Sequence, residues 1–191
     1  MRMEMLDVVD AGGMPTGETV ERSIAHRDGI RHRTAHVWIA RRQEGRVQVL
    51  LQKRSRNKDS FPGMYDTSSA GHIPAGVEPL PSALREMEEE LGICACAEDL
   101  VKAGMFTIRY AREFHGEMFR DHEVATVYVY RKKVDADRLV LQESEVESVR
   151  WFDLAEVSEG LKRPSSVFCV PQPGLDVLEN YLEQGGYVPE I

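Results

Sequence analysis

The sequence has few cysteines, few aromatic residues and no long apolar run. Aromatic residues make up 7% of its 191 residues. Apolar stretches such as Val37–Ala40 and Val47–Gln52 are far shorter than the ~20 residues that cross a bilayer, and the N-terminus lacks the apolar stretch of a signal peptide. The three cysteines, Cys94, Cys96 and Cys169, are odd in number and badly spaced for pairing, which excludes a disulfide framework. We therefore expect a cytoplasmic protein with reduced thiols.

Positive charge is also in deficit. The chain has 24 Lys plus Arg against 32 Asp plus Glu, a formal net charge of −8. This balance argues against general binding to nucleic acid polymers or to membrane surfaces, so any phosphate must be bound locally. Hydrophobic residues make up 42% of the chain, and no linker or repeat divides it. We predict one domain spanning residues 1–191.

Strand and helix patterns are mixed along the chain. Strands are predicted where apolar and β-branched residues gather near turns: Leu6–Val9, His36–Ala40, Val47–Arg54, Val124–Lys132 and Val149–Asp153. Amphipathic helices are predicted over Pro79–Leu91 and around Leu175–Leu182. Such mixing indicates an α/β or α+β fold.

The predicted helix Pro79–Leu91 carries a crowded acidic patch. Glu86, Glu89 and Glu90 are neighbours on the helix surface at spacings of three and four residues. They repel one another, and each costs about 0.3 to 1 kcal/mol near the negative end of the helix dipole. A solvated acidic face is the simplest interpretation. A divalent cation reverses the repulsion, and Mg²⁺ takes carboxylates together with substrate phosphates. Arg85 can orient one of these carboxylates through paired hydrogen bonds.

The stretch Gly71–Ile93 resembles the signature of the Nudix hydrolases. That signature is Gly, five residues, Glu, seven residues, then Arg-Glu-aliphatic-any-Glu-Glu-any-Gly-aliphatic. The residues in register are Gly71, Arg85, Glu86, Met87, Glu89, Glu90, Gly92 and Ile93. One position departs, because Val77 stands where the first Glu belongs and Glu78 follows it. The resemblance implies a Nudix fold, a mixed β-sheet between helices, with an N-terminal extension and a C-terminal helix.

The same resemblance implies a metal-dependent hydrolase. Its substrate would be a nucleoside diphosphate derivative or another small organic diphosphate, cleaved by water attack at phosphorus. Glu89 and Glu90 would be the main Mg²⁺ ligands, Glu86 a further ligand or the base that activates water, and Gly71 the source of a backbone carbonyl ligand. Arg85 would complete the catalytic set, and Mn²⁺ is an alternative ion. A homodimer would be consistent with this family.

A second resemblance extends over most of the chain. Residues 8–26, 50–72 and 150–157 are similar to isopentenyl diphosphate isomerase, a Nudix superfamily member that moves a double bond. Its metal ligands correspond here to His26, His32, His72, Asp121 and Glu123. Its basic residues that hold the diphosphate correspond to Arg54 and Lys58, and Tyr110 also matches. Three imidazoles and two carboxylates suit Mn²⁺, Mg²⁺ or Zn²⁺.

The isomerase resemblance breaks at its proton chemistry. That reaction needs two acid–base groups on opposite faces of an alkene, one of them a cysteine just before the Gly-His pair. Ala70 occupies that position, and no cysteine is nearby in the sequence. Hydrolysis is therefore favoured. Two alternatives stay open: an isomerase whose catalytic acid has moved elsewhere, and a catalytically reduced module that binds a nucleotide or diphosphate.

Overall fold

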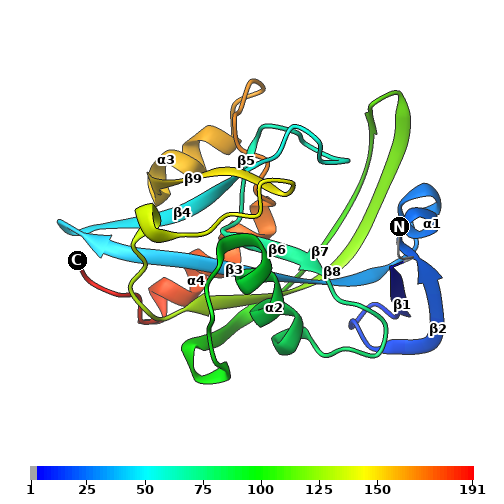
Figure 1. The fold of residues 1–191 in the computed structure, drawn as a ribbon, viewed down its shortest axis with the longest axis horizontal. Helices are drawn as coiled ribbons and strands as arrows, with labels where there is room; N and C mark the ends of the chain where they lie inside the picture. The colour runs from blue at the N-terminus through cyan, green and yellow to red at the C-terminus, as the bar shows by residue number, and fades with distance from the viewer. Residues whose placement is uncertain (1–3) are drawn as a thin grey trace.

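Strands and helices interleave along the chain in the computed structural model, which describes residues 4–191 (Figure 1). The strands are β1 (Met5–Val9), β2 (Pro15–Glu21), β3 (His32–Gln43), β4 (Arg46–Arg54), β5 (Tyr65–Asp66), β6 (Ser69–His72), β7 (Leu100–Phe114), β8 (Glu117–Tyr130) and β9 (Val146–Asp153). The helices are α1 (Arg22–Asp28), α2 (Pro79–Leu91), α3 (Leu154–Leu161) and α4 (Gln172–Glu183).

A mixed sheet of seven strands forms the centre of the fold. Its main path is β5-β4-β3-β8-β7, with β6 added to β3 and β9 added to β4. β3 and β8 run parallel, whereas β3 pairs with β4 and β6 in the antiparallel sense. β1 and β2 form a separate hairpin. The predicted class, a mixed sheet combined with helices, is confirmed.

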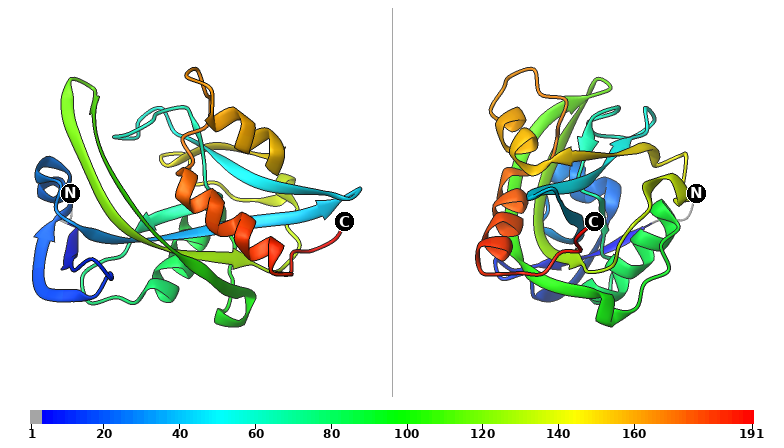
Figure 2. Two further views of the ribbon diagram at one scale, coloured as in Figure 1. Left: turned by 180° about the vertical axis from the view of Figure 1, so that it is seen from behind. Right: turned by 90° about the vertical axis from the view of Figure 1, so that its left-hand side faces the viewer.

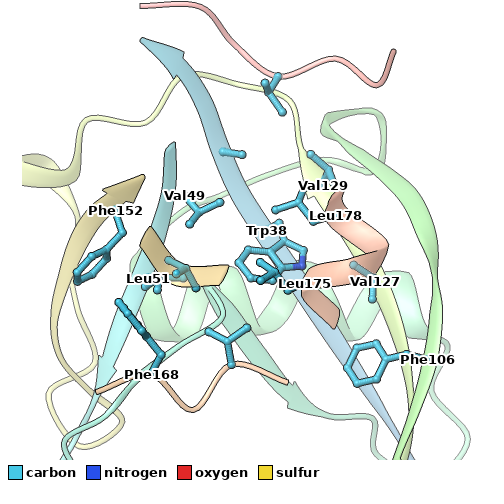
Figure 3. Packing of buried hydrophobic residues seen from close by; sticks show 14 of the residues in the cluster. Trp38, Val49, Leu51, Phe106, Val127, Val129, Phe152, Phe168, Leu175 and Leu178 are labelled. Atoms are coloured by element: carbon cyan, nitrogen blue, oxygen red, sulfur yellow. The ribbon is translucent and has the colours of Figure 1, made fainter. Parts of the chain in front are cut away.

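Helices cover both faces of this sheet. α2 lies on one face and α4 on the other, as the opposite views show (Figures 1 and 2). Because side chains alternate along a strand, β3 serves both layers. Val37 and Ile39 join the apolar cluster that contains Met87 of α2, whereas Trp38 joins the cluster that contains Leu175 of α4 (Figure 3). The long β7–β8 hairpin projects beyond the layered body (Figure 2).

Helix α2 has the bounds that the sequence predicts. Pro79 lies at its start, where a missing backbone N–H costs nothing. Gly92 ends it in a left-handed conformation with φ of 68°. Met87 and Leu91 are completely buried, and burying each is worth about 1.5 to 3 kcal/mol. Local signals and packing therefore agree on this helix.

The segment between β1 and β3 is mostly polar, and its sequence shows neither apolar periodicity nor a side-chain helix cap. It nevertheless forms β2 and α1. α1 has seven residues and buries only Ala25 and His26.

All three cysteines are unpaired thiols, as expected. Within residues 4–191, no helix is both long enough and apolar enough to cross a bilayer.

Candidate functional site

A cavity of about 630 Å³ lies between α2, β3, β6, the β7–β8 hairpin and the loop after β4. In Figure 1 that loop extends towards the hairpin, and the two are in contact because the Phe61 and Phe114 ring centroids are 4.9 Å apart. The cavity wall carries nine carboxylate side chains against four from arginine or lysine. Such an excess of negative charge around one cavity favours the uptake of cations.

The acidic patch of α2 faces this cavity. Glu86 is largely buried and accepts a hydrogen bond from Arg85 Nη2 at 2.6 Å. Glu90 is 3% exposed and accepts a hydrogen bond from Ser69 Oγ at 2.7 Å. Glu89 is half exposed at the rim, 3.4 Å from Arg85 Nη1. The three carboxylates therefore line one cavity, as their spacing predicts, but with very different burial.

Burial changes the acidity of the two inner carboxylates. It raises the pKa of Glu86 to about 7, and the charge of Glu89 adds to the shift. It also raises the pKa of Glu90 to about 7, although the Ser69 hydrogen bond opposes the shift. Near neutral pH each group is poised between its charged and neutral forms. A nearby cation would favour the charged forms.

Gly71 allows Glu86 to reach its position. A Cβ atom at residue 71 would lie 2.3 Å from Glu86 Cδ and 2.6 Å from both carboxylate oxygens. Real Cβ atoms essentially never lie this close, so a side chain at residue 71 would force the Glu86 carboxylate to shift. The first glycine of the signature is thus explained by the approach of Glu86 to the β6 backbone.

Val77, the residue that departs from the signature, is held through its backbone. Arg33 Nη2 donates hydrogen bonds to Val77 O at 3.0 Å and to Asp7 Oδ2 at 2.8 Å. Asp7 also accepts a hydrogen bond from the backbone N–H of Gly76. The Val77 side chain packs against the apolar cluster under α2. The turn before the helix is therefore fixed without a carboxylate at residue 77.

A second group of ligand-type side chains lies across the cavity from α2. One face of the sheet is apolar over Trp38 and becomes polar towards the start of β3, where His32 lies. The neighbouring strand β8 changes in the same way, from Val127 to Glu123 and Asp121. Because His32 pairs with Glu123 in the β3–β8 register, the polar ends of both strands meet.

The five residues implied by the isomerase resemblance come together there. His26 Nε2 and His72 Nε2 are 3.0 Å apart. His32 Nε2 lies 3.9 Å from both Asp121 Oδ1 and Glu123 Oε1. His26 Nδ1 is 3.7 Å from Asp121 Oδ1. Four elements, α1, β3, β6 and β8, therefore supply two overlapping groups of three donor side chains that share His32.

Several donor atoms in this set lack a partner. Within residues 4–191, His26 Nδ1, His32 Nε2 and Asp121 Oδ1 are buried and make no hydrogen bond. His32 Nδ1 faces the carbonyl oxygen of Ile30 at 2.8 Å, which places the lone pair on Nε2. Leaving buried polar atoms unpaired is costly. A bound divalent cation would satisfy all three, so the residues fit a metal.

The protonation states also suit ligation. Burial lowers the pKa of His26 to about 4 and that of His72 well below its usual range, so both rings are neutral at pH 7. Burial and repulsion by Glu123 raise the pKa of Asp121, a shift that a bound cation would reverse. Burial opposes the charge of Glu123, but His36 and His32 outweigh it and lower its pKa. Neutral imidazoles beside a charged carboxylate are the ligand forms that metals bind.

The residues predicted to hold a diphosphate reach the cavity, but each already has a partner. Arg54 donates a hydrogen bond to Asp66 Oδ2 at 2.9 Å. Lys58 forms an ion pair with Glu145. Burial and the neighbouring Asp121 raise the pKa of Tyr110, so its phenol is neutral. A diphosphate would have to compete with Asp66 and Glu145 for these cations.

Several cavity residues were not predicted from the sequence, among them Glu145, Cys169 and His36. Glu145 precedes β9, Cys169 precedes α4, and His36 lies on β3. The alternation of His32, Thr34 and His36 at a period of two could have indicated one polar strand face. Nothing local marks Glu145 or Cys169, because only the tertiary fold brings them to the cavity.

The pKa of Glu90 leads to a prediction about stability. The folded-state pKa of Glu90 is about 7, against an ordinary value of 4.5. Below pH 4.5 the group is protonated in both states and does not affect stability. Between pH 4.5 and pH 7 burial of the group increasingly destabilises the folded state. Without metal, Glu90→Gln should therefore stabilise the protein at pH 8, by up to about 3 kcal/mol, and change little at pH 4.5. Urea unfolding with a chelator tests this. With Mg²⁺ the wild type should regain stability and the variant should not; equal effects at both pH values would contradict the prediction.

Comparison with known proteins gives relatives that are similar in sequence. Residues 30–168 match the NUDIX domain. Nudix hydrolase 3 of Arabidopsis thaliana is 36% identical over 171 residues, which are 88% of this chain but 22% of that protein. An uncharacterised Nudix hydrolase of Clostridium acetobutylicum is 33% identical over 195 residues, covering 99% of this chain and 92% of the relative. This chain thus spans about a fifth of the plant protein and nearly all of the bacterial one.

Solved structures agree at the level of the fold. DR0079 from Deinococcus radiodurans has a TM-score of 0.62 and 17% identity, covering 93% of this chain and 99% of that one. The NUDIX domain of Shewanella oneidensis NrtR, complexed with ADP ribose, has a TM-score of 0.53 and 18% identity, covering 80% of this chain and 86% of that one.

Proposed function

This chain belongs to the Nudix hydrolase family, and from that premise we propose that it is a divalent-cation-dependent diphosphatase. Its substrate would be a nucleoside diphosphate derivative or another organic diphosphate, cleaved by water attack at phosphorus. We propose that residues 1–191 act as one Nudix domain with an N-terminal extension and a C-terminal helix. Mg²⁺ would be the ion, with Mn²⁺ as an alternative.

One observation carries the proposal. The inner carboxylates Glu86 and Glu90 are buried in a cavity with excess negative charge, and their pKa values are raised to about 7. Local stability disfavours this arrangement, because each charge loses solvation and repels its neighbours. A cation bound together with a diphosphate makes the arrangement favourable.

The acidic residues of α2 would bind the metal ion and activate water. Glu86, Glu89 and Glu90, with the backbone carbonyl of Gly71, would hold Mg²⁺. When bound, the ion would offset charge on the phosphoryl oxygens and lower the pKa of a coordinated water. Glu86 is poised to accept a proton near neutral pH, and Arg85 orients its carboxylate.

The remaining cavity residues would bind the substrate and a further ion. Arg54 and Lys58 would hold the diphosphate, with Tyr110 beside it on the hairpin. The cluster of histidines and carboxylates across the cavity would take a cation that accepts nitrogen ligands, such as Mn²⁺ or Zn²⁺. The members of this cluster are His26, His32, His72, Asp121 and Glu123.

A screen of diphosphates tests the proposal. ADP-ribose, which the Shewanella relative binds, would be included with dinucleotide and alkyl diphosphates. Products would be identified by mass spectrometry in ¹⁸O-labelled water, with Mg²⁺ and with a chelator. Mg²⁺-dependent release of a phosphate bearing ¹⁸O supports the proposal. Tight binding without turnover would indicate a reduced binding module instead.

A second candidate keeps the isomerase resemblance, and one observation favours it. The cavity is lined by Ala70, where that enzyme has its cysteine, but also by Cys169. Burial raises the pKa of the Cys169 thiol, so the group is protonated at neutral pH, as a proton donor must be, although the shift also makes it a weaker acid. Glu123 and Tyr110 supply the other matching groups. Incubating isopentenyl diphosphate in deuterated water separates the two activities, because isomerisation incorporates deuterium without releasing phosphate.

A further inference from the structure

The two oxygens of Glu123 face different neighbours. Glu123 Oε1 lies 3.9 Å from His32 Nε2 and 3.9 Å from His72 Nε2, towards the proposed cation. Glu123 Oε2 accepts a hydrogen bond from Thr34 Oγ1 at 3.1 Å and lies 3.9 Å from His36 Nε2. Oε1 thus faces the other members of the metal-binding cluster, which consists of His26, His32, His72, Asp121 and Glu123 itself. Oε2 faces Thr34 and His36 of β3.

His36 occupies a buried position with little other polar contact. It is 6% exposed, and its ring meets the Phe106 ring edge-on at a centroid distance of 5.2 Å. Within the described residues its Nδ1 atom makes no hydrogen bond, and its ion-pair contact within 4 Å is with Glu123. In the β3–β6 register it lies opposite Ala70, whose small side chain leaves room for the ring. Burying the polar nitrogens of an imidazole costs free energy unless they interact with a polar partner. Glu123 is the charged partner near His36 Nε2.

We propose that His36 is a positioning residue for the metal-binding cluster. The Thr34 hydroxyl would hold Glu123 Oε2 by a hydrogen bond, and the His36 Nε2–H would attract the same oxygen across 3.9 Å, so that Oε1 stays directed at the cation. The inference rests on the proposed function, since it requires a cation beside His26, His32 and His72. Groups that orient a metal-binding carboxylate typically change metal affinity by about 10- to 100-fold when removed.

A packing role for His36 predicts a different outcome. If the ring only fills space beside Phe106, replacing it would change the free energy of unfolding and leave ion affinity unchanged. If the ring orients Glu123, the presence of an N–H at the position of Nε2 should decide the affinity. Gln and Met test this, because they have similar length but only Gln carries the donor.

The experiment compares His36→Gln with His36→Met by Co²⁺ titration of the full chain. Ligand-field absorption reports nitrogen-rich coordination, and urea unfolding without metal reports the fold. We expect His36→Met to weaken Co²⁺ binding by about 10- to 100-fold, and His36→Gln to retain most of the affinity. Glu156→Gln, a change at an exposed position of α3 that does not line the cavity, serves as a control for the Co²⁺ spectrum.

Four outcomes would overturn the inference. Wild-type affinity in a folded His36→Met protein, or equal losses in both variants, would remove the role of the N–H. Failure of the wild type to bind Co²⁺ would overturn the metal-binding cluster itself and this inference with it. If His36→Met does not fold, ¹H–¹⁵N NMR of the Zn²⁺-loaded wild type decides, because a bare Nε2 on His36 contradicts the proposal.

Discussion

Glu86→Gln is expected to lower kcat by about 10²- to 10⁴-fold, the range typical of losing a general acid or base. Glutamine keeps the size of the side chain and its contact with Arg85, but it cannot accept a proton. Burial raises the pKa of Glu86 to about 7 in the metal-free protein, and bound Mg²⁺ would lower it, so wild-type turnover should rise with pH and level off by about neutrality. The variant should lose this ionisation. Initial rates of product release between pH 5 and pH 9 measure both effects.

Glu89→Gln is the matched control for this prediction. Both variants replace a glutamate of α2 by glutamine. Glu89, however, is half exposed at the rim of the cavity. Its loss should weaken Mg²⁺ binding and be partly overcome by raising the Mg²⁺ concentration. Loss of Glu86 should not be overcome in this way. Equal losses in both variants, both restored by Mg²⁺, would assign Glu86 to ion binding alone.

Gly71→Ala is expected to cost about 10²-fold in kcat, the size of effect that follows from displacing a catalytic group by about 1 Å. The added methyl would collide with the Glu86 carboxylate, because its calculated distance to Cδ is 2.3 Å. Pushing Glu86 away from β6 separates it from its position beside Arg85. Rates and Mg²⁺ affinity of the purified variant measure the loss, and circular dichroism checks that the sheet remains.

A shorter acid should partly repair this variant. In Gly71→Ala combined with Glu86→Asp, the carboxylate is drawn back by one methylene and the collision is relieved. We expect the double variant to be more active than the product of the two single losses predicts. Gly12→Ala, a change at a turn remote from the cavity, should leave the rates unchanged. Full activity in Gly71→Ala alone would show that the collision does not matter.

Most of α2 could be predicted from the sequence. Pro79, the apolar period and Gly92 set its bounds, and these signals act between residues only a few positions apart. The spacing of Glu86, Glu89 and Glu90 placed them together for the same reason. The helix α1 was missed because its seven residues bury almost nothing apolar, and contacts with β8 hold it instead.

The sequence by itself determined the acidic helix, the mixed fold class and the family, since each depends on local periodicity or on fixed spacing along the chain. Only the tertiary structure decided which carboxylates are buried, which cations are already paired, and that His36 and Cys169 reach the cavity. The physical reason is that burial and charge pairing depend on segments far apart in sequence. His26 and His72, 46 positions apart, come within 3.0 Å only because α1 and β6 converge beside β3.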